Sequence, residues 1–149
     1  MKSLIVDMIV ISKKKLKLLK EILTLTKKQR VSIEDKDIES LSEILEKKDE
    51  TIERINELDK SLKKLKLSLR EYEVQSIKDI DSDKYINAKD LKNISKKIEK
   101  VLLDIKEIDD YNNKLSKELL KKFKSNVKGI KESRRVTNIY NQNMNRRGF

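Results

Sequence analysis

A long aliphatic repeat constrains this chain more than any other feature of its sequence. The repeat steps by three and four residues, as Leu91, Ile94, Ile98, Val101, Ile105, Ile108, Leu115 and Leu119. This spacing places its members on one stripe of an α-helix, while charged residues occupy the rest of each turn. Because such a stripe must be covered by another helix, the repeat predicts a protein whose helices pack against each other or against a partner.

The composition supports an all-α fold and argues against enzymatic activity. The 149 residues are 42% charged and 36% hydrophobic, with no proline and two glycines, which is typical of long helices and coiled coils. The sequence contains no cysteine and no histidine, so it lacks thiolates, the commonest metal ligand and the usual acid/base group at neutral pH. No paired nucleophile and base and no phosphate-binding loop can be recognised in it. We therefore expect no catalytic residue, cofactor, metal ion or small-molecule substrate.

The apolar spacing predicts three helices, over residues 4–31, 37–76 and 89–131, in one helical bundle. The first helix has a broad apolar face that can contact two neighbours. The second carries a heptad-like seam from Ile38 to Tyr72, in which Lys48 is the one charged member. We interpret Lys48 as a lysine whose stem covers the seam while its ammonium group reaches solvent. Helices of about forty residues would be about 60 Å long, so we expect an elongated antiparallel hairpin or three-helix coiled-coil bundle.

Polar residues mark the breaks between these helices and one position within a seam. Asp37 is placed to cap the start of the second helix. Asp79, Asp81 and Asp83 are expected to form a turn, because they lack the central glycine and closing glutamate of a calcium-binding loop. Asn112 enters the third seam where leucine would be expected, and a polar residue there predicts a role in fixing helix register.

Charge is distributed unevenly along the chain. Residues 1–31 contain 9 basic and 2 acidic residues, residues 32–110 contain 17 and 22, and residues 111–149 contain 11 and 2, which accounts for the net charge of +11. The acidic middle favours pairing with the basic first helix, and the basic C-terminal part remains available for a partner. No stretch reaches the roughly 20 apolar residues that span a bilayer, so we expect a cytoplasmic location.

Beyond Phe123 the sequence encodes helix more weakly, although apolar residues continue at helical spacing. Gly129 lies within this part, and glycine costs about 1 kcal/mol relative to alanine inside a helix. The first helix is expected to be too short to cover this end, so the segment would order on contact with a partner helix. Residues 132–149 are predicted to be a flexible tail, or one ordered by a client; a frayed tail without a role is the alternative.

The layout of the chain resembles the FlgN family of flagellar export chaperones, and next to it the FliT chaperones. The second helix opens as Asp37-Ile38-Glu39-Ser40-Leu41 and continues as Ile44-Leu45-Glu46-Lys47-Lys48, and the third carries Ile105, Ile108, Asn112 and Leu115 in register. A basic, aliphatic first helix precedes them. The resemblance is one of pattern and covers nearly the full chain.

This resemblance implies a small helical cytoplasmic chaperone that binds hook-filament junction proteins and presents them to the flagellar type III export apparatus. Its clients would be hook-associated proteins of the FlgK and FlgL type, and the chaperone itself would be a monomer or weak dimer. In the family the C-terminal region grips the client. The matching client-binding positions here are Phe123, Val127, Ile130, Val136, Ile139 and Tyr140.

Two other classes of function compete with the chaperone hypothesis. A basic coiled coil could bind nucleic acid or an anionic surface through Lys121, Lys122, Lys124, Lys128, Lys131, Arg134 and Arg135. These residues spread around a helix rather than forming one stripe, and aromatic residues for base stacking are few, so nucleic acid is the less favoured partner. A self-associating structural coiled coil is the other alternative, and it predicts a stable oligomer.

Overall fold

The computed structural model describes residues 1–126, which contain three long helices and no strand. Helix α1 spans Lys2–Glu34, α2 spans Ile38–Ser68 and α3 spans Asn87–Asn126. Two short 3-10 helices, η1 (Leu69–Tyr72) and η2 (Ile77–Asp79), lie between α2 and α3. The all-α class and the three-helix organisation that the apolar spacing predicted are confirmed.

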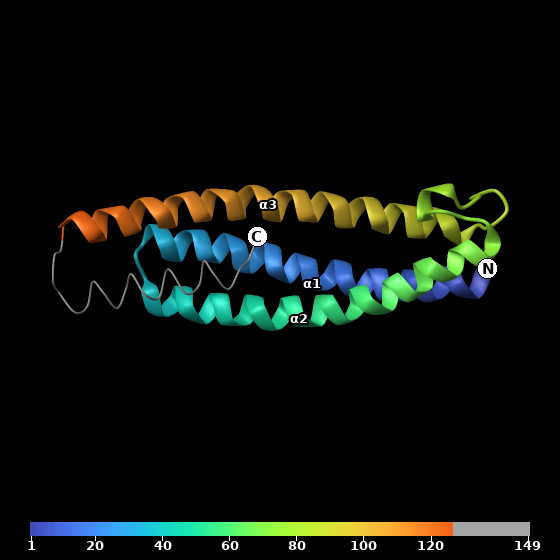
Figure 1. Ribbon diagram of the computed structural model, residues 1–149, viewed down its shortest axis with the longest axis horizontal. Coiled ribbons are helices and arrows are strands. Elements are labelled where there is room, and N and C mark those ends of the chain that lie inside the picture. Colours follow the sequence, from blue (N-terminus) through green and yellow to red (C-terminus); the bar gives the residue numbers. More distant parts are fainter. Residues whose placement is uncertain (127–149) are drawn as a thin grey trace. The chain divides into compact units, whose positions relative to one another are not determined.

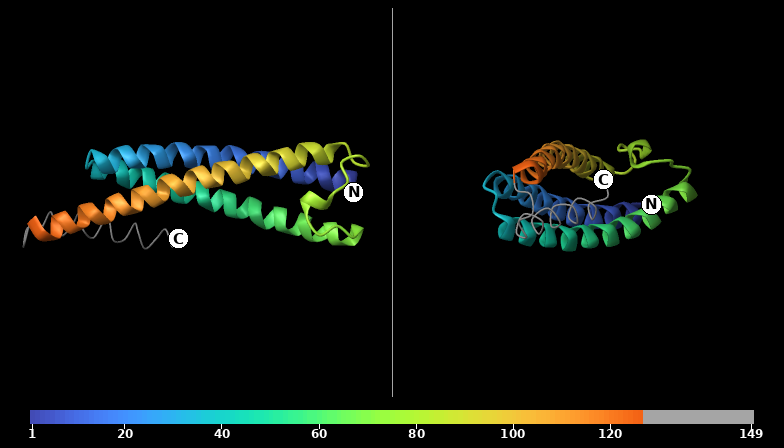
Figure 2. Two further views of the ribbon diagram at one scale, coloured as in Figure 1. Left: turned by 90° about the horizontal axis from the view of Figure 1, so that it is seen from above. Right: turned by 60° about the vertical axis from the view of Figure 1, so that its left-hand side comes forward.

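The helices contribute to two compact units, and each unit takes a segment from all three of them. Unit 1 consists of Met1–Thr24 and Asp49–Asp104, and unit 2 of Leu25–Lys48 and the chain from Ile105 onward. Within each unit these segments lie side by side (Figures 1 and 2). Each of the eight residues of the predicted α3 stripe is buried or partly buried, so the repeat does face the other helices.

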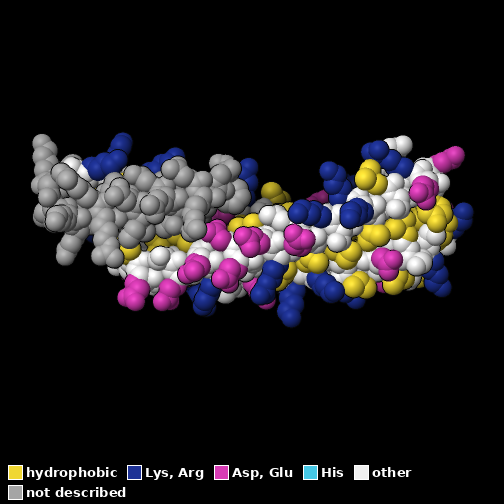
Figure 3. Space-filling view, turned by 60° about the horizontal axis from the view of Figure 1, so that its bottom comes forward, with side chains coloured by type: hydrophobic (Ala, Val, Ile, Leu, Met, Phe, Trp, Pro, Cys, Tyr) yellow, Lys and Arg dark blue, Asp and Glu magenta, His cyan; other side chains and the backbone are white. Residues whose placement is uncertain are grey.

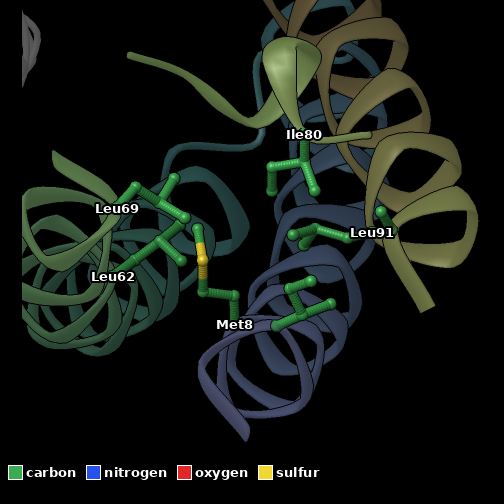
Figure 4. Close-up of a cluster of buried hydrophobic side chains, with 7 residues drawn as sticks. Met8, Leu62, Leu69, Ile80 and Leu91 are labelled. Carbon is green, nitrogen blue, oxygen red and sulfur yellow. The ribbon is translucent and has the colours of Figure 1, made fainter. Parts of the chain in front are cut away.

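The core of unit 1 is built from aliphatic side chains and one methionine. Its buried members are Ile5, Met8, Leu62, Leu69, Ile80, Ala88 and Leu91. Met8 extends from α1 toward Leu62 and Leu69, while Ile80 and Leu91 lie on the α3 side of the cluster (Figure 4). Burying each isoleucine, leucine or methionine side chain of this set contributes about 1.5–3 kcal/mol, so this cluster is a major source of stability for the unit.

The turn between α1 and α2 is closed by backbone hydrogen bonds and a side-chain cap. Lys36 has a left-handed φ of 56°, and the amides of Lys36 and Asp37 donate to the carbonyls of Ile33 and Ser32, at 3.1 and 2.9 Å. This pattern is the Schellman closure of a helix C-terminus. The Asp37 carboxylate then accepts from the amide of Ser40 at 3.1 Å, which confirms the predicted cap.

The end of α2 repeats this closure and corrects the predicted length of the second helix. Glu73 has a φ of 60°, and the amides of Glu73 and Val74 donate to the carbonyls of Arg70 and Leu69. The α-helix ends at Ser68 rather than near residue 76, because the chain tightens into η1 and then reverses. Tyr72, the predicted last member of the seam, is 49% exposed because a 3-10 turn rotates it off the α-helical stripe.

Between η1 and α3 the aspartates act as turn residues, as predicted. The Asp81 carboxylate accepts from the amides of Asp83 and Lys84 at 2.9 and 3.3 Å. Ser76 donates through its hydroxyl to Asp79 Oδ2 at 3.0 Å. Lys92 of α3 donates to the Ile80 carbonyl and to Ser82 Oγ, so this connection is fastened to the helix that follows it.

Candidate functional site

The helical segments of unit 2 enclose a layer of buried polar side chains. Lys48 of α2 is 3% exposed, and its ammonium group donates to Gln29 Oε1 of α1 and to Asp109 Oδ1 of α3, each at 3.0 Å. One lysine thus connects all three helices of the unit. A buried ion pair of this kind adds little net stability relative to an apolar core, but removing one partner is costly because a charge remains buried.

This geometry corrects the sequence-based interpretation of Lys48. We expected its ammonium group to reach solvent, whereas Lys48 ends inside the unit on two polar partners. The signal that could have revealed this lies in the other two seams. Gln29 follows Ile22 by seven residues, and Asp109 follows Ile105 by four, so each occupies a core-facing position of its own helix. One polar residue at a seam position in each helix predicts a shared polar layer.

Asn112 adds a second buried polar contact to unit 2. Its side chain is fully buried, and Nδ2 donates to the Thr26 carbonyl at 3.1 Å. Its Oδ1 atom is buried without a hydrogen-bond partner among the described residues. The predicted placement of Asn112 inside the seam is therefore correct. A buried amide that reaches the backbone of one particular residue on another helix favours one register over others.

Toward the end of α3 the core of unit 2 becomes apolar again. Its buried members are Ile33, Leu41, Leu45, Leu119 and Leu120, with Leu115 and Phe123 partly buried against them. Ile33 is the last buried residue of α1, and Leu41 is the first of α2. The apolar spacing predicted that the first helix ends at residue 31, whereas α1 continues to Glu34 and brings Ile33 into the cluster against which Phe123 packs.

The structure therefore places one of the six predicted client-binding residues. Phe123 lies at the edge of the apolar cluster of unit 2. The other five, Val127, Ile130, Val136, Ile139 and Tyr140, lie outside the described residues. Of the predicted basic residues, Lys121, Lys122 and Lys124 have exposed side chains on α3, and Lys128, Lys131, Arg134 and Arg135 also lie outside.

A cation–π contact lies on the outside of unit 2, and it was not predicted from the sequence. The guanidinium of Arg30 lies 4.9 Å from the centre of the Tyr111 ring, and its Nε donates to Glu34 Oε1 at 3.1 Å. Tyr111 remains 47% exposed. A cation over an exposed ring contributes about 0.5–1 kcal/mol, so this contact helps to hold the last turns of α1 against α3.

Among residues 1–126 no group of histidine, cysteine, aspartate or glutamate side chains is arranged to hold a metal ion. Across the same residues no helix is both long enough and apolar enough to cross a membrane. Unit 2 thus contains a buried polar layer that sets helix register and, further along α3, an apolar cluster. Phe123 lies at the edge of this cluster and is partly accessible to a partner.

Comparison with known proteins places the chain in a family. A family model described as FlgN protein matches residues 1–148, nearly the full length. No curated protein and no solved structure matches the chain. The match agrees with the helix layout and with the apolar stripe of α3. The chain belongs to the FlgN family of flagellar export chaperones.

Proposed function

We propose that this chain is a cytoplasmic chaperone that binds hook-associated proteins of the FlgK and FlgL type and presents them to the flagellar type III export apparatus. The family match across residues 1–148 is the observation that carries this proposal. The client would be bound by the end of α3 and the residues that follow it. The chaperone acts as a monomer or weak dimer, with no small-molecule substrate.

The way the intramolecular cover of α3 ends supports this placement. Phe123 packs against a cluster to which Ile33 and Leu41 belong, and these residues flank the turn at which α1 and α2 meet. Ile33 is the last buried residue of α1 and Leu41 is the first of α2, so neither helix extends the buried core past this turn. The sequence nevertheless continues the stripe with Val127 and Ile130 at helical spacing. An amphipathic client helix would supply the apolar cover that α1 and α2 do not.

The polar layer gives the proposed binding segment a defined anchor. Lys48 and Asp109 hold α3 to α2, and Asn112 holds it to α1, about three to four turns before Phe123, where the proposed client contact begins. A client helix that packs onto the stripe therefore meets a helix whose register is already set. Fixing one partner in advance lowers the conformational entropy that binding must overcome.

The test uses the full chain and a purified hook-associated protein, with affinity measured by isothermal titration calorimetry. The variant Val127→Gln/Ile130→Gln removes apolar surface and introduces glutamine, which has a higher helix propensity than valine or isoleucine. We expect it to weaken binding by roughly a hundredfold, from about 1.5 kcal/mol lost for each of the two side chains. The matched control is Val6→Gln/Val10→Gln, which changes two exposed valines of unit 1 and should leave the affinity unchanged.

Equal affinity of the Val127→Gln/Ile130→Gln variant and the unmodified chain would refute the placement of the client on this stripe.

The salt dependence of binding distinguishes the chaperone hypothesis from the nucleic-acid alternative. Apolar client binding should persist between low and physiological salt, whereas phosphate binding should fall steeply across that range. A stable oligomer in sedimentation without any client affinity would instead support a self-associating coiled coil.

A further inference from the structure

Unit 1 contains a groove that the proposed client contact does not use. It has a volume of about 640 Å³ and is bounded by the last turns of α2, the connection that includes the start of η2, and the first turns of α3. Its lining residues are Lys66, Gln75, Ser76, Ile77, Lys78, Lys92, Ser95, Lys96 and Glu99. All of them belong to unit 1, whereas Phe123 belongs to unit 2.

The charge of this groove is strongly positive. Four lysines line it against a single glutamate. Lys92 is engaged, because its ammonium group donates to the Ile80 carbonyl and to Ser82 Oγ. Lys66, Lys78 and Lys96 are exposed and form no salt bridge within residues 1–126. Three ammonium groups without a salt bridge in the described part of the chain thus line the groove, and the hydrogen bonds of Lys92 join its α3 side to the connection that precedes α3.

The groove continues into an apolar surface on α3. Leu102 and Leu103 follow Glu99 by three and four residues, so they lie one turn further along the same side of the helix. Leu103 is 68% exposed and Leu102 is 44% exposed. Ile77 contributes an apolar side chain to the lining itself. Exposed large apolar residues beside a cationic groove are typical of a protein-binding surface.

We propose that this groove and the adjoining Leu102 and Leu103 bind an acidic amphipathic segment of a partner protein. Carboxylates of the segment would pair with Lys66, Lys78 and Lys96, and its apolar side chains would cover the two leucines. The lysines favour an anionic occupant, and the exposed Leu102 and Leu103 favour one that also carries apolar side chains, which nucleic acid lacks. The groove lining offers no aromatic ring on which a base could stack.

The probe is a fluorescein-labelled helical peptide of about 15 residues with glutamates on one face and leucines along its edge. Fluorescence anisotropy measures its binding to the full chain at low and physiological salt. A peptide with glutamine in place of each glutamate is the charge control. We expect the acidic peptide to bind and the glutamine peptide to bind at least about tenfold more weakly.

Two double variants locate the site. Lys66→Gln/Lys96→Gln removes one groove lysine from α2 and one from α3, and should weaken acidic-peptide binding by about tenfold. The matched control is Lys64→Gln/Lys97→Gln, which takes one exposed lysine from each of the same helices outside the groove lining, and should change binding by less than about twofold. Leu103→Gln should also weaken binding, with a loss that does not depend on salt. Circular dichroism melts confirm that each variant is folded.

Three results would overturn this proposal. The first is equal weakening by the groove variant and the matched control, which would mean diffuse attraction between opposite charges. The second is equal binding of the acidic and glutamine peptides, or no binding of the acidic peptide. The third is a single-stranded DNA oligonucleotide that displaces the peptide and loses its own affinity with Lys66→Gln/Lys96→Gln, because the groove would then be a polyanion site.

Discussion

The two units of this protein differ in the polar side chains that they bury. Unit 1 closes around Met8, Leu62 and Leu69, and the buried polar side chains among its described residues are the uncharged Ser12 and Thr51. Unit 2 buries Lys48, Asp109 and Asn112 before its apolar cluster begins. An apolar core gains stability from surface removed from water, whereas a buried polar layer favours one arrangement of helices over others. The comparison indicates that unit 1 supplies stability and unit 2 supplies register.

The largest effect should come from separating the ion pair of unit 2. Asp109→Leu removes the carboxylate that pairs with the buried Lys48 ammonium group, and we expect a loss of about 3–5 kcal/mol in the free energy of unfolding. Lys48→Met/Asp109→Leu removes both charges and should recover most of this loss. Urea denaturation measures both variants. If the double variant were as unstable as the single one, the loss of stability would come from altered packing rather than from the unpaired charge.

Truncation of the unit 1 core should be nearly as damaging. Leu69→Ala opens a cavity beside Met8 and Leu62, and we expect the free energy of unfolding to fall by about 2–4 kcal/mol. The control is Val10→Ala, whose valine is 47% exposed and should change stability by less than about 0.5 kcal/mol. A small effect of Leu69→Ala would contradict the assignment of this cluster as the main source of stability in unit 1.

Replacing Asn112 by leucine should raise the free energy of unfolding, whereas the two preceding substitutions lower it. The change removes the buried Oδ1 atom that has no partner within the described residues, so we expect about 1 kcal/mol of added stability together with a less specific helix register. Thermal melts report the first effect, and sedimentation reports mixed association states that arise from the second. A destabilised variant with unchanged association would show that the hydrogen bond to the Thr26 carbonyl outweighs the unpaired oxygen.

The smallest effects should come from the two helix C-termini. Lys36 in unit 2 and Glu73 in unit 1 both adopt left-handed φ angles that favour glycine. We expect Lys36→Gly and Glu73→Gly each to raise the free energy of unfolding by up to about 1 kcal/mol. Similar gains at both sites would show that the two turns are equivalent despite the different cores. A loss at either site would mean that the side chain contributes more than the backbone strain costs.

Sequence periodicity predicted the helices well because each stripe is local information. The α3 repeat, the broad face of α1 and the Asp37 cap depend on residues a few positions apart, and the structure confirms all three. The end of α2 was predicted less well, because Glu73 adopts a left-handed conformation without a glycine to signal it. A rule based on glycine and proline could not have found that turn.

The polar layer of unit 2 was missed for a different reason. The partners of Lys48 are 19 and 61 residues away along the chain, so no local pattern links them. Whether the ammonium group of an isolated seam lysine is buried or reaches solvent can be predicted only when the facing positions of the other helices are known. For the client-binding residues, the sequence predicted a continuous stripe, and the structure describes Phe123 alone of the six. The roles of the other five stay predictions.

Hydrogen-deuterium exchange of the full chain, with and without a purified hook-associated protein, tests the central claim most directly. We predict that the client slows amide exchange from about Phe123 onward, at the edge of the cluster that α1 and α2 cover, and leaves the amides of Met8 and Leu62 in unit 1 unchanged. Protection confined to unit 1, or a client that binds without protecting the end of α3, would contradict it.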